Sequence, residues 1–402
     1  MTGALLHPFA SPARTEWIDV VRGDGALIWD SNGKEYIDAT AGLWYCNAGH
    51  GRHEIVEAVT AQMRELEAYH LFDPFTNPVA DAVAERIAGI TAVERARVFL
   101  CSSGSEAVDS AMKLARLAQV RAGHPERTVI ISRQRGYHGT NYGGTSAQGL
   151  PLNKEGYGEL LAEVIQVDAD DSEAMSRTML EYEGRVAAVL TEPVQGAAGV
   201  YPPLPGYLEE TRRLCDQHGA FLIFDEVITA FGRLGPWFAA DQFGVLPDLT
   251  TFAKGVTSGY QPLGGVVLAP AVHEPLAADP AFVLRHGYTY SGHPAACAAG
   301  LANIDLLEGL LGEAVRIGAQ MRSGFEALRG DGAIEEVRGI GAMFGLRIGG
   351  PRTPAEVRDR LHDRGVIARP IGTDTLTFSP PLVITDEQIG RVVDAVAGAL
   401  AD

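Results

Sequence analysis

Three polar segments that could do chemistry each follow a run of apolar residues. Lys254 comes just after D248-L-T-T-F252, Asp225 ends F221-L-I-F-D225, and S102-S-G-S-E106 follows V98-F-L-C101. Each run predicts a short buried strand. Because ligands bind beyond the carboxyl ends of the strands in an open parallel sheet, we expect the three segments to meet at one site.

Lys254 is a candidate nucleophile. It lies among small and apolar residues, and no acidic residue stands within five positions of it. A buried lysine shifts toward the neutral amine, which attacks carbonyl groups to form Schiff bases. The alternative is a lysine whose ammonium group reaches solvent, which is the commoner case for a lysine taken alone.

Asp225 is expected to be largely buried at the end of its strand, where a carboxylate needs a cationic partner. One interpretation is a carboxylate that holds a proton on a heterocyclic nitrogen, as pyridoxal phosphate enzymes require. The other is an aspartate that pairs with a local arginine or caps a helix.

The segment S102-S-G-S-E106 opens a predicted helix. Free backbone N–H groups and the helix dipole make such a turn an anion site, and Gly104 lets an anion approach the backbone closely. The alternative is an ordinary helix cap by Ser103 or Ser105. Together, an anion site, a carboxylate and a lysine match the phosphate, ring nitrogen and aldehyde of pyridoxal phosphate, which we predict as the cofactor.

The order of the motifs along the chain is similar to that of one enzyme family. The motifs are S103-G-S-E-A107, G136-Y-H-G139, E192-P-V-Q-G196, D225-E-V-I-T-A-F-G-R-L-G235, F252-A-K-G255 and G287-Y-T-Y-S-G-H-P294. In this order, and spread over nearly the whole chain, they resemble the class III aminotransferases, which depend on pyridoxal phosphate and have fold type I. The closest resemblance is to the ω-amino acid and amine:pyruvate transaminases.

This resemblance implies a role for each matching residue. Lys254 would hold the cofactor as a Schiff base and move the substrate proton, and Asp225 would pair with the ring nitrogen. Thr289 would reach the phosphate in the partner subunit, so the active sites of a homodimer would be shared. The other implied cofactor-binding residues are Ser103, Gly104, Ser105, Tyr137, His138, Glu192, Gln195 and Val227. For His138, an acid–base role and a structural hydrogen bond are both open.

The substrate side is implied by two further segments. A41-G-L-W-Y-C-N-A-G-H50 resembles the subgroup in which aromatic residues, here Trp44 and Tyr137, line the pocket. Arg369 resembles a mobile arginine that binds a keto acid carboxylate and swings out for an uncharged amine. Its alternative is a surface arginine. Ala197 stands where relatives that act on ornithine or GABA commonly have glutamate.

We therefore predict an aminotransferase that moves an amino group from an ω-amino acid or amine to a keto acid, with pyruvate expected, by a ping-pong mechanism. One alternative is another class III enzyme, namely a mutase, epimerase or decarboxylase, since the same lysine, acid and anion site serve all of these. Another is a non-catalytic protein that binds pyridoxal phosphate.

The elements that position these residues predict an α/β fold. Strand-like and helix-like segments alternate over residues 51–300, which predicts a large domain whose mostly parallel sheet is covered by helices on both faces. Residues 301–402 predict a smaller α+β domain that opens with one long amphipathic stretch over 301–329. Residues 1–50, with an Asn-Gly hairpin at S31-N-G-K34, are expected to join the small domain.

Composition narrows the partners and the compartment. The net charge of −18 argues against nucleic acid and anionic membranes as partners. The first fourteen residues lack a signal-peptide pattern, and no apolar run is long enough to span a membrane. The four cysteines form no CxxC pair, and C215-D-Q-H218 and H50-G-R-H53 lack a second pair of metal ligands. We expect a cytoplasmic protein without a metal site.

Overall fold

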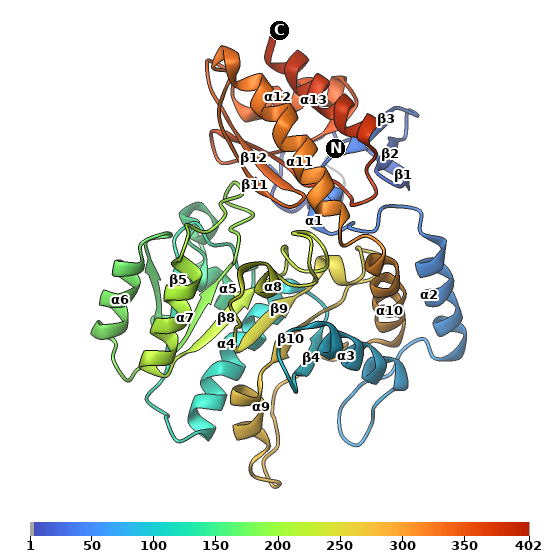
Figure 1. Ribbon diagram of the computed structural model, residues 1–402. Helices are drawn as coiled ribbons and strands as arrows, with labels where there is room; N and C mark the ends of the chain where they lie inside the picture. The colour runs from blue at the N-terminus through green and yellow to red at the C-terminus, as the bar shows by residue number, and fades with distance from the viewer. Residues whose placement is uncertain (1–3, 402) are drawn as a thin grey trace.

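The computed structural model describes residues 4–401, and its core is a seven-stranded sheet in the lower half of Figure 1. The five strands from β9 to β6 run parallel, whereas β10 is antiparallel to both β9 and β4. The mostly parallel sheet is confirmed, although the sequence pattern did not indicate β6 or β10. In spatial order the strands are β4 (Arg97–Cys101), β10 (Gly264–Leu268), β9 (Leu249–Phe252), β8 (Phe221–Asp225), β7 (Val186–Thr191), β5 (Val129–Arg133) and β6 (Val164–Val167).

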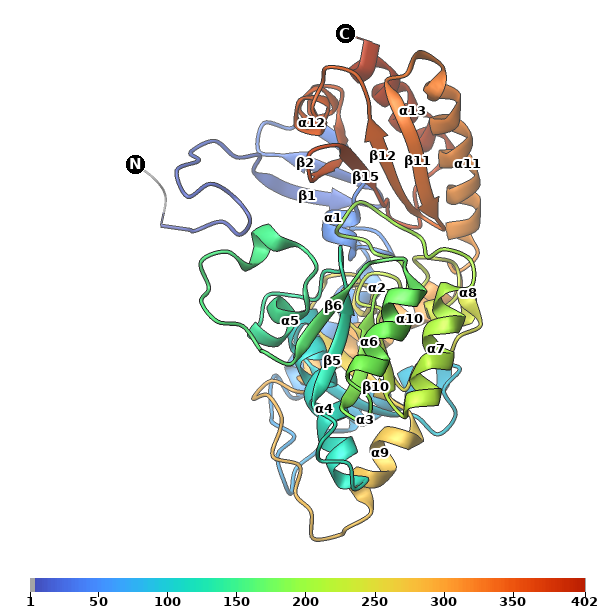
Figure 2. The same ribbon diagram turned by 90° about the vertical axis from the view of Figure 1, so that its left-hand side faces the viewer.

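Helices cover both faces of this sheet because successive side chains of each strand point to opposite faces. Leu222 and Phe224 of β8 belong to one core, and Ile223 between them belongs to another. In Figure 2 the sheet lies between α4 and the pair α6 and α7. The first core includes residues of α3 (Pro78–Ile90), α6 (Ser172–Glu181), α7 (Tyr207–His218) and α10 (Pro294–Glu308); the second includes residues of α4 (Gly104–Arg121), α5 (Tyr142–Ala147) and α9 (Pro270–Ala277).

The C-terminal part has an antiparallel sheet of its own, drawn at the top of Figure 1. Its three helices bury one apolar side each against this sheet and against one another. The strands, in spatial order, are β11 (Ile334–Ile340), β12 (Met343–Ile348), β15 (Thr375–Phe378) and β14 (Arg369–Ile371), and the helices are α11 (Glu313–Ala327), α12 (Pro354–Asp363) and α13 (Asp386–Ala401).

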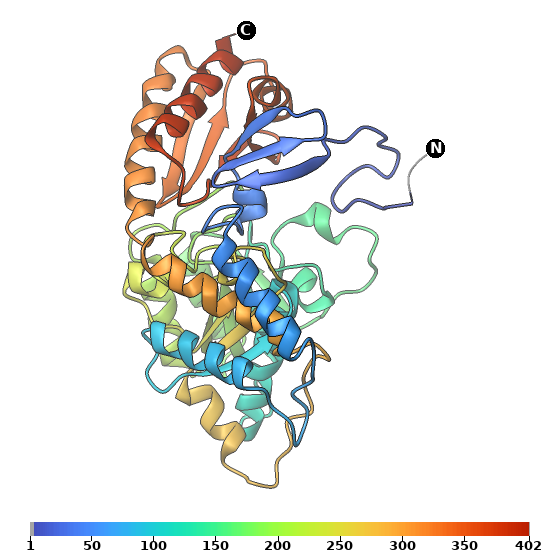
Figure 3. The same ribbon diagram turned by 90° about the vertical axis from the view of Figure 1, so that its right-hand side faces the viewer.

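The N-terminal strands join the C-terminal part, as Figure 3 shows. The predicted hairpin is confirmed, since β2 (Leu27–Asp30) and β3 (Glu35–Asp38) are antiparallel and Gly33 takes a φ of +80° in their turn. On one side of them lies β1 (Val20–Asp24). On the other side, β3 pairs in parallel with β13 (Val366–Ile367), so strands from the two ends of the chain form one sheet.

The expected single stretch over residues 301–329 is wrong. Helix α10 ends at Glu308 and α11 begins at Glu313, with Gly309 and Gly312 between them. These two glycines favour a break in the helix because glycine has a low helix propensity. The division into residues 1–50, 51–300 and 301–402 stays our proposal, and residues 1–3 and 402 lie outside the described part of the chain.

Over residues 4–401 no single helix is long and apolar enough to cross a bilayer. Helix α10 and residues 313–330 meet the criteria of length and composition only as a pair, and the two are bent by 66° relative to each other. Within the same residues, no group of three His, Cys, Asp or Glu side chains could hold a metal ion.

The remaining elements are short, apart from α2. They are α1 (Ala41–Trp44), α2 (His53–Glu65), α8 (Ala239–Phe243) and the 3₁₀ turns η1 (Pro151–Lys154), η2 (Lys254–Val256) and η3 (Leu328–Asp331).

Candidate active site

A cavity of about 590 Å³ lies beyond the carboxyl ends of the parallel strands. One side is formed by the segments that follow β4, β5, β7, β8 and β9, and the other side includes β14 of the C-terminal part. The structure thus brings together most of the residues that the sequence singled out. The predicted residues that line the cavity are Trp44, Ser103, Gly104, Ser105, Tyr137, His138, Glu192, Asp225, Val227, Lys254 and Arg369.

Lys254 follows β9 at the start of a 3₁₀ turn, and its backbone adopts a φ of +47°. Its side chain lines the cavity, and its Nζ lies 6.0 Å from the centre of the Trp44 ring. Burial of the ammonium group lowers the pKa of Lys254 to about 8, although the negative charge of Asp225 opposes this shift. A larger fraction of this amine than of an ordinary lysine is therefore neutral near pH 7 and can act as a nucleophile.

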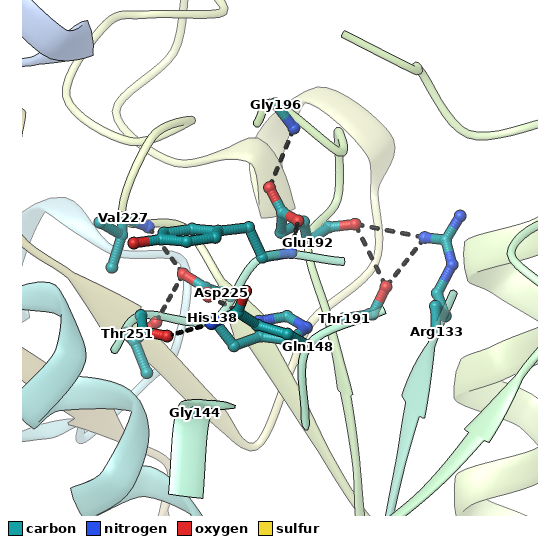
Figure 4. Close-up of polar contacts among 12 residues, drawn as sticks. Arg133, His138, Gly144, Gln148, Thr191, Glu192, Gly196, Asp225, Val227 and Thr251 are labelled. Atoms are coloured by element: carbon teal, nitrogen blue, oxygen red, sulfur yellow. Dashed lines mark hydrogen bonds and ion pairs between the residues drawn. The ribbon is translucent and has the colours of Figure 1, made fainter. Parts of the chain in front are cut away.

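Asp225 is buried, and three donors fix its carboxylate, as Figure 4 shows. His138 donates from Nδ1 to Oδ2 at 2.8 Å, Thr251 donates from Oγ1 to Oδ1 at 3.1 Å, and the Val227 N–H donates to Oδ1 at 3.2 Å. Thr251 stands directly opposite Asp225 in the β8–β9 pairing. The carboxylate can therefore neither rotate nor leave the cavity wall without breaking buried hydrogen bonds.

His138 makes one of the two contacts considered for it, a structural hydrogen bond to Asp225. The ring is buried, and a carboxylate can only accept, so Nδ1 carries the proton in this bond. The other ring nitrogen, Nε2, is buried and has no hydrogen-bond partner within the described residues. His138 thus makes the structural hydrogen bond, and it orients Asp225.

The ordinary helix cap is present at the start of α4, and the anion site beside it stays a prediction. The Ser103 hydroxyl accepts a hydrogen bond from the Glu106 N–H at 3.2 Å, and the Glu106 carboxylate accepts one from the Ser102 N–H at 2.7 Å. Gly104 and Ser105, the first two residues of the helix, line the cavity, and backbone N–H groups in the first turn of a helix have no partner within the helix. A Cβ on Gly104 would lie only 2.8 Å from Cγ1 of Val227, so a side chain there would close the gap.

Glu192 organises the cavity wall beside Asp225. Its buried carboxylate accepts hydrogen bonds from the N–H groups of Tyr137 at 2.8 Å and Gly196 at 2.9 Å. Burial raises the pKa of Glu192 to about 7, and the nearby charge of Asp225 adds to this. Glu192 thereby fixes the segment that presents the Tyr137 ring to the cavity.

Two predicted residues do not line the cavity. Gln195 is buried behind the wall, where its Nε2 donates to the Gln134 carbonyl at 2.7 Å and its Oε1 has no partner within residues 4–401. Thr289 is exposed on the segment between α9 and α10. Its proposed contact would be with a second subunit, which a single chain does not contain.

Arg369 and Trp44 face each other at the far side of the cavity. The guanidinium carbon lies 5.3 Å from the centre of the indole ring, within the range of a cation–π contact. Arg369 is partly buried and lines the cavity, and burial lowers the pKa of its guanidinium group. Arg369 thus lines the cavity as predicted, and its role toward a substrate carboxylate stays a prediction.

Several cavity residues escaped the sequence analysis. Leu43 lines the cavity and stands next to Trp44 in the sequence. Thr251 does not line the cavity but donates to Asp225, and its one signal was a polar residue within a predicted apolar strand. The remaining ones come from loops, the 3₁₀ turn η1, strand β14 and the N-terminal segment, none of which carries a pattern that indicates a site. They include Pro8, Phe9, Leu150, Pro151, Leu152, Ile228 and Ile371.

The lining residues fit pyridoxal phosphate. The open backbone at Gly104 and Ser105 suits a phosphate, and the buried carboxylate of Asp225 suits a protonated ring nitrogen. The low pKa of Lys254 suits an amine that reacts with an aldehyde. Each of the three groups follows a different strand of one sheet and faces the same cavity.

Comparison with known proteins establishes the family. Residues 9–400 match the family described as aminotransferase class-III. The chain belongs to the class III aminotransferases. This aminotransferase has the PLP-dependent fold type I, and pyridoxal phosphate is its cofactor.

The aminotransferase is similar to proteins with three related names. It is 37% identical to the beta-alanine–pyruvate aminotransferase of Pseudomonas aeruginosa, over 95% of this chain and 91% of the relative. It is 38% identical to the omega-aminotransferase of Caulobacter vibrioides, over 91% of this chain and 90% of the relative. An amine transaminase from an uncultivated Pseudomonas species, solved in its PLP-bound form, superposes with a TM-score of 0.94 at 37% identity, over 99% and 98% of the two chains.

The lowered pKa of Lys254 can be tested in the protein freed of its cofactor. We expect the rate of covalent uptake of pyridoxal phosphate to rise with pH through about 8, because only the neutral amine attacks the aldehyde. Stopped-flow absorbance measures this rate, and Lys254→Arg, which keeps the charge but not the nucleophile, is the control. An inflection near the ordinary lysine pKa of about 10.4 would contradict the burial of the amine.

Proposed function

We propose that this aminotransferase moves the amino group of an ω-amino acid or of an amine with an apolar substituent to pyruvate. The observation on which the proposal depends is that one charged side chain lies among apolar side chains where the cavity is expected to bind the substrate. Arg369 faces the cavity there among Leu43, Trp44, Ile228 and Ile371. One guanidinium group can pair with one carboxylate, and an apolar wall suits an uncharged substituent.

Ala197 supports this choice of substrates. Its side chain lines the cavity and carries no charge, so Arg369 meets no carboxylate from this position. The guanidinium group therefore stays free to bind a substrate carboxylate as a bidentate pair. The named relatives, one of which acts on beta-alanine and pyruvate, agree with a keto acid of this size.

Different residues of the cavity would have different roles in the reaction. When bound, pyridoxal phosphate supplies a ring that accepts the electrons of the substrate's breaking C–H bond. Lys254 Nζ would take the proton from the carbon of the amino donor in one half-reaction and would give a proton to the carbon of the keto acid in the other. A pKa of about 8 suits both directions of transfer. Asp225 would hold a proton on the ring nitrogen, and Gly104 and Ser105, at the start of α4, would bind the phosphate.

We further propose a homodimer whose subunits share their active sites, located in the cytoplasm. The exposed segment with Thr289 also exposes Val283 and Tyr290, with 62% and 66% of their surface accessible, which suits an apolar contact with a second copy. All four cysteines are free and buried, which agrees with a reducing compartment.

A panel of donors and acceptors tests the proposed substrates. With pyruvate as acceptor, we expect alanine to form from beta-alanine and from 1-phenylethylamine. We expect 2-oxoglutarate to be a poorer acceptor, because its second carboxylate would lie against the apolar wall. Chromatographic assay of the amino acid products measures both, with Lys254→Ala as the blank. Faster formation of glutamate than of alanine, or product from a donor without any acceptor, would overturn the proposal.

Mixed dimers test whether Thr289 serves the partner's site. A doubly tagged heterodimer would combine one Lys254→Ala subunit with one Thr289→Asp subunit, whose added carboxylate repels phosphate. If the sites are shared, the cavity with an intact lysine receives its threonine from the other subunit, and we expect about half of the wild-type activity per dimer. Activity no higher than that of the two parent variants would show that Thr289 does not act across the interface.

A further inference from the structure

The turn that carries Trp44 is strained. Ala41, Gly42 and Trp44 adopt φ values of +46°, +65° and +61°. Residues with a Cβ avoid this region unless their surroundings hold them there. The strained turn points Leu43 and Trp44 into the cavity, where the indole ring faces both Lys254 and Arg369.

One carboxylate holds this turn. Asp38, at the end of β3, is buried, and its Oδ2 accepts a hydrogen bond from the Gly42 N–H at 2.7 Å. Its Oδ1 accepts from the Thr40 N–H at 3.2 Å and from the Thr40 hydroxyl at 2.9 Å. Three donors from the turn itself thus converge on a single side chain, which compensates for the strained backbone.

His50 completes the arrangement from the other end of the segment. Its Nε2 lies 2.9 Å from Oδ2 of Asp38, and its backbone exchanges two hydrogen bonds with Gly25 next to β2. The hydrogen bond to Asp38, and a further contact with the thiol of Cys46, raise the pKa of His50 to about 10 even though burial opposes this shift. The ion pair therefore stays charged across the neutral pH range.

The same carboxylate lies beside the strand that leads to Arg369. Asp38 is paired with Ile367 in the parallel β3–β13 ladder, and Arg369 follows Ile367 by two residues. The Ser379 N–H, just after β15, donates to the Ala39 carbonyl at 2.7 Å. Asp38 is thus placed where the turn that carries Trp44 and the strand that carries Arg369 meet.

We propose that the Asp38–His50 ion pair is a positioning device that sets the indole of Trp44 against Arg369 and thereby determines how tightly the keto acid carboxylate is bound. The proposal rests on the substrate-side roles of Trp44 and Arg369 given above. Neither Asp38 nor His50 is among the residues that line the cavity, so both act through the turn. If the turn relaxes, the indole moves and the guanidinium loses the ring that it faces.

Asp38→Asn removes the charge at almost constant size. The asparagine amide has one oxygen that accepts and one NH₂ group that donates. Its NH₂ group would therefore face either Thr40 or the Gly42 N–H, both of which donate to the carboxylate of Asp38 in the wild-type protein. The expected result is an increase of about tenfold in the KM for pyruvate, with kcat changed by less than about threefold. Asp30→Asn is the matched control: Asp30 accepts three hydrogen bonds within the neighbouring hairpin, which does not line the cavity, and its KM should stay at the wild-type value.

A double-mutant cycle with Trp44→Phe separates positioning from a general structural effect. If Asp38 acts through the indole, Asp38→Asn should raise the KM for pyruvate by less than about twofold in the Trp44→Phe background. Additive effects in the two backgrounds, or an unchanged KM in Asp38→Asn, would overturn the proposal. Should Asp38→Asn fail to fold, His50→Gln, which keeps an N–H donor but loses the charge, replaces it in the same cycle.

Hydrogen exchange gives a readout that does not depend on turnover. The Gly42 amide is protected by its bond to Asp38, so exchange in a peptide spanning residues 39–46 should accelerate in Asp38→Asn and not in Asp30→Asn. Unchanged exchange in both variants would refute the proposal that Asp38 stabilises the turn before Trp44. A wild-type enzyme that makes no alanine would instead refute the proposed substrates, since exchange of the turn does not depend on them.

Discussion

The carboxylate of Asp225 is buried at the end of a central strand and accepts hydrogen bonds from His138, Thr251 and the Val227 backbone. A buried carboxylate is tolerated only when its lone pairs are satisfied, so these bonds tie together β8, β9 and the segment after β5. Lys254 follows β9, the parallel neighbour of β8, which places the amine and the acid in the wall of the same cavity. The negative charge also limits how far burial lowers the pKa of Lys254.

The central part of the site could be predicted from the sequence because it depends on short-range patterns. Lys254, Asp225 and the turn at Gly104 each follow an apolar run, and parallel strands end at the same edge of a sheet. The fold class followed from the same alternation of strands and helices. The β2–β3 hairpin was found because Asn-Gly favours the conformation that its turn requires, as the φ of Gly33 shows.

Other features of the structure depend on contacts between segments that are distant in the sequence, so no local sequence pattern indicates them. Strand β10 lies between β4 and β9 and was not identified from the sequence. A Cβ on Gly265 would meet Phe252 at 2.5 Å, so close packing within the sheet requires glycine there. The strained turn before Trp44 is held by Asp38 and His50, and no propensity of the turn residues predicts it. Cavity residues such as Phe9 come from segments that acquire their role only in the folded chain.

The rate of amino transfer in Asp225→Asn tests the central claim most directly. The amide keeps the size of the side chain but cannot hold a proton on the ring nitrogen as a carboxylate does. Bound cofactor should persist in the visible spectrum, while the single-turnover rate from donor to cofactor should fall by about a hundredfold or more. A variant that retains cofactor and transfers the amino group within about twofold of the wild-type rate would contradict the account.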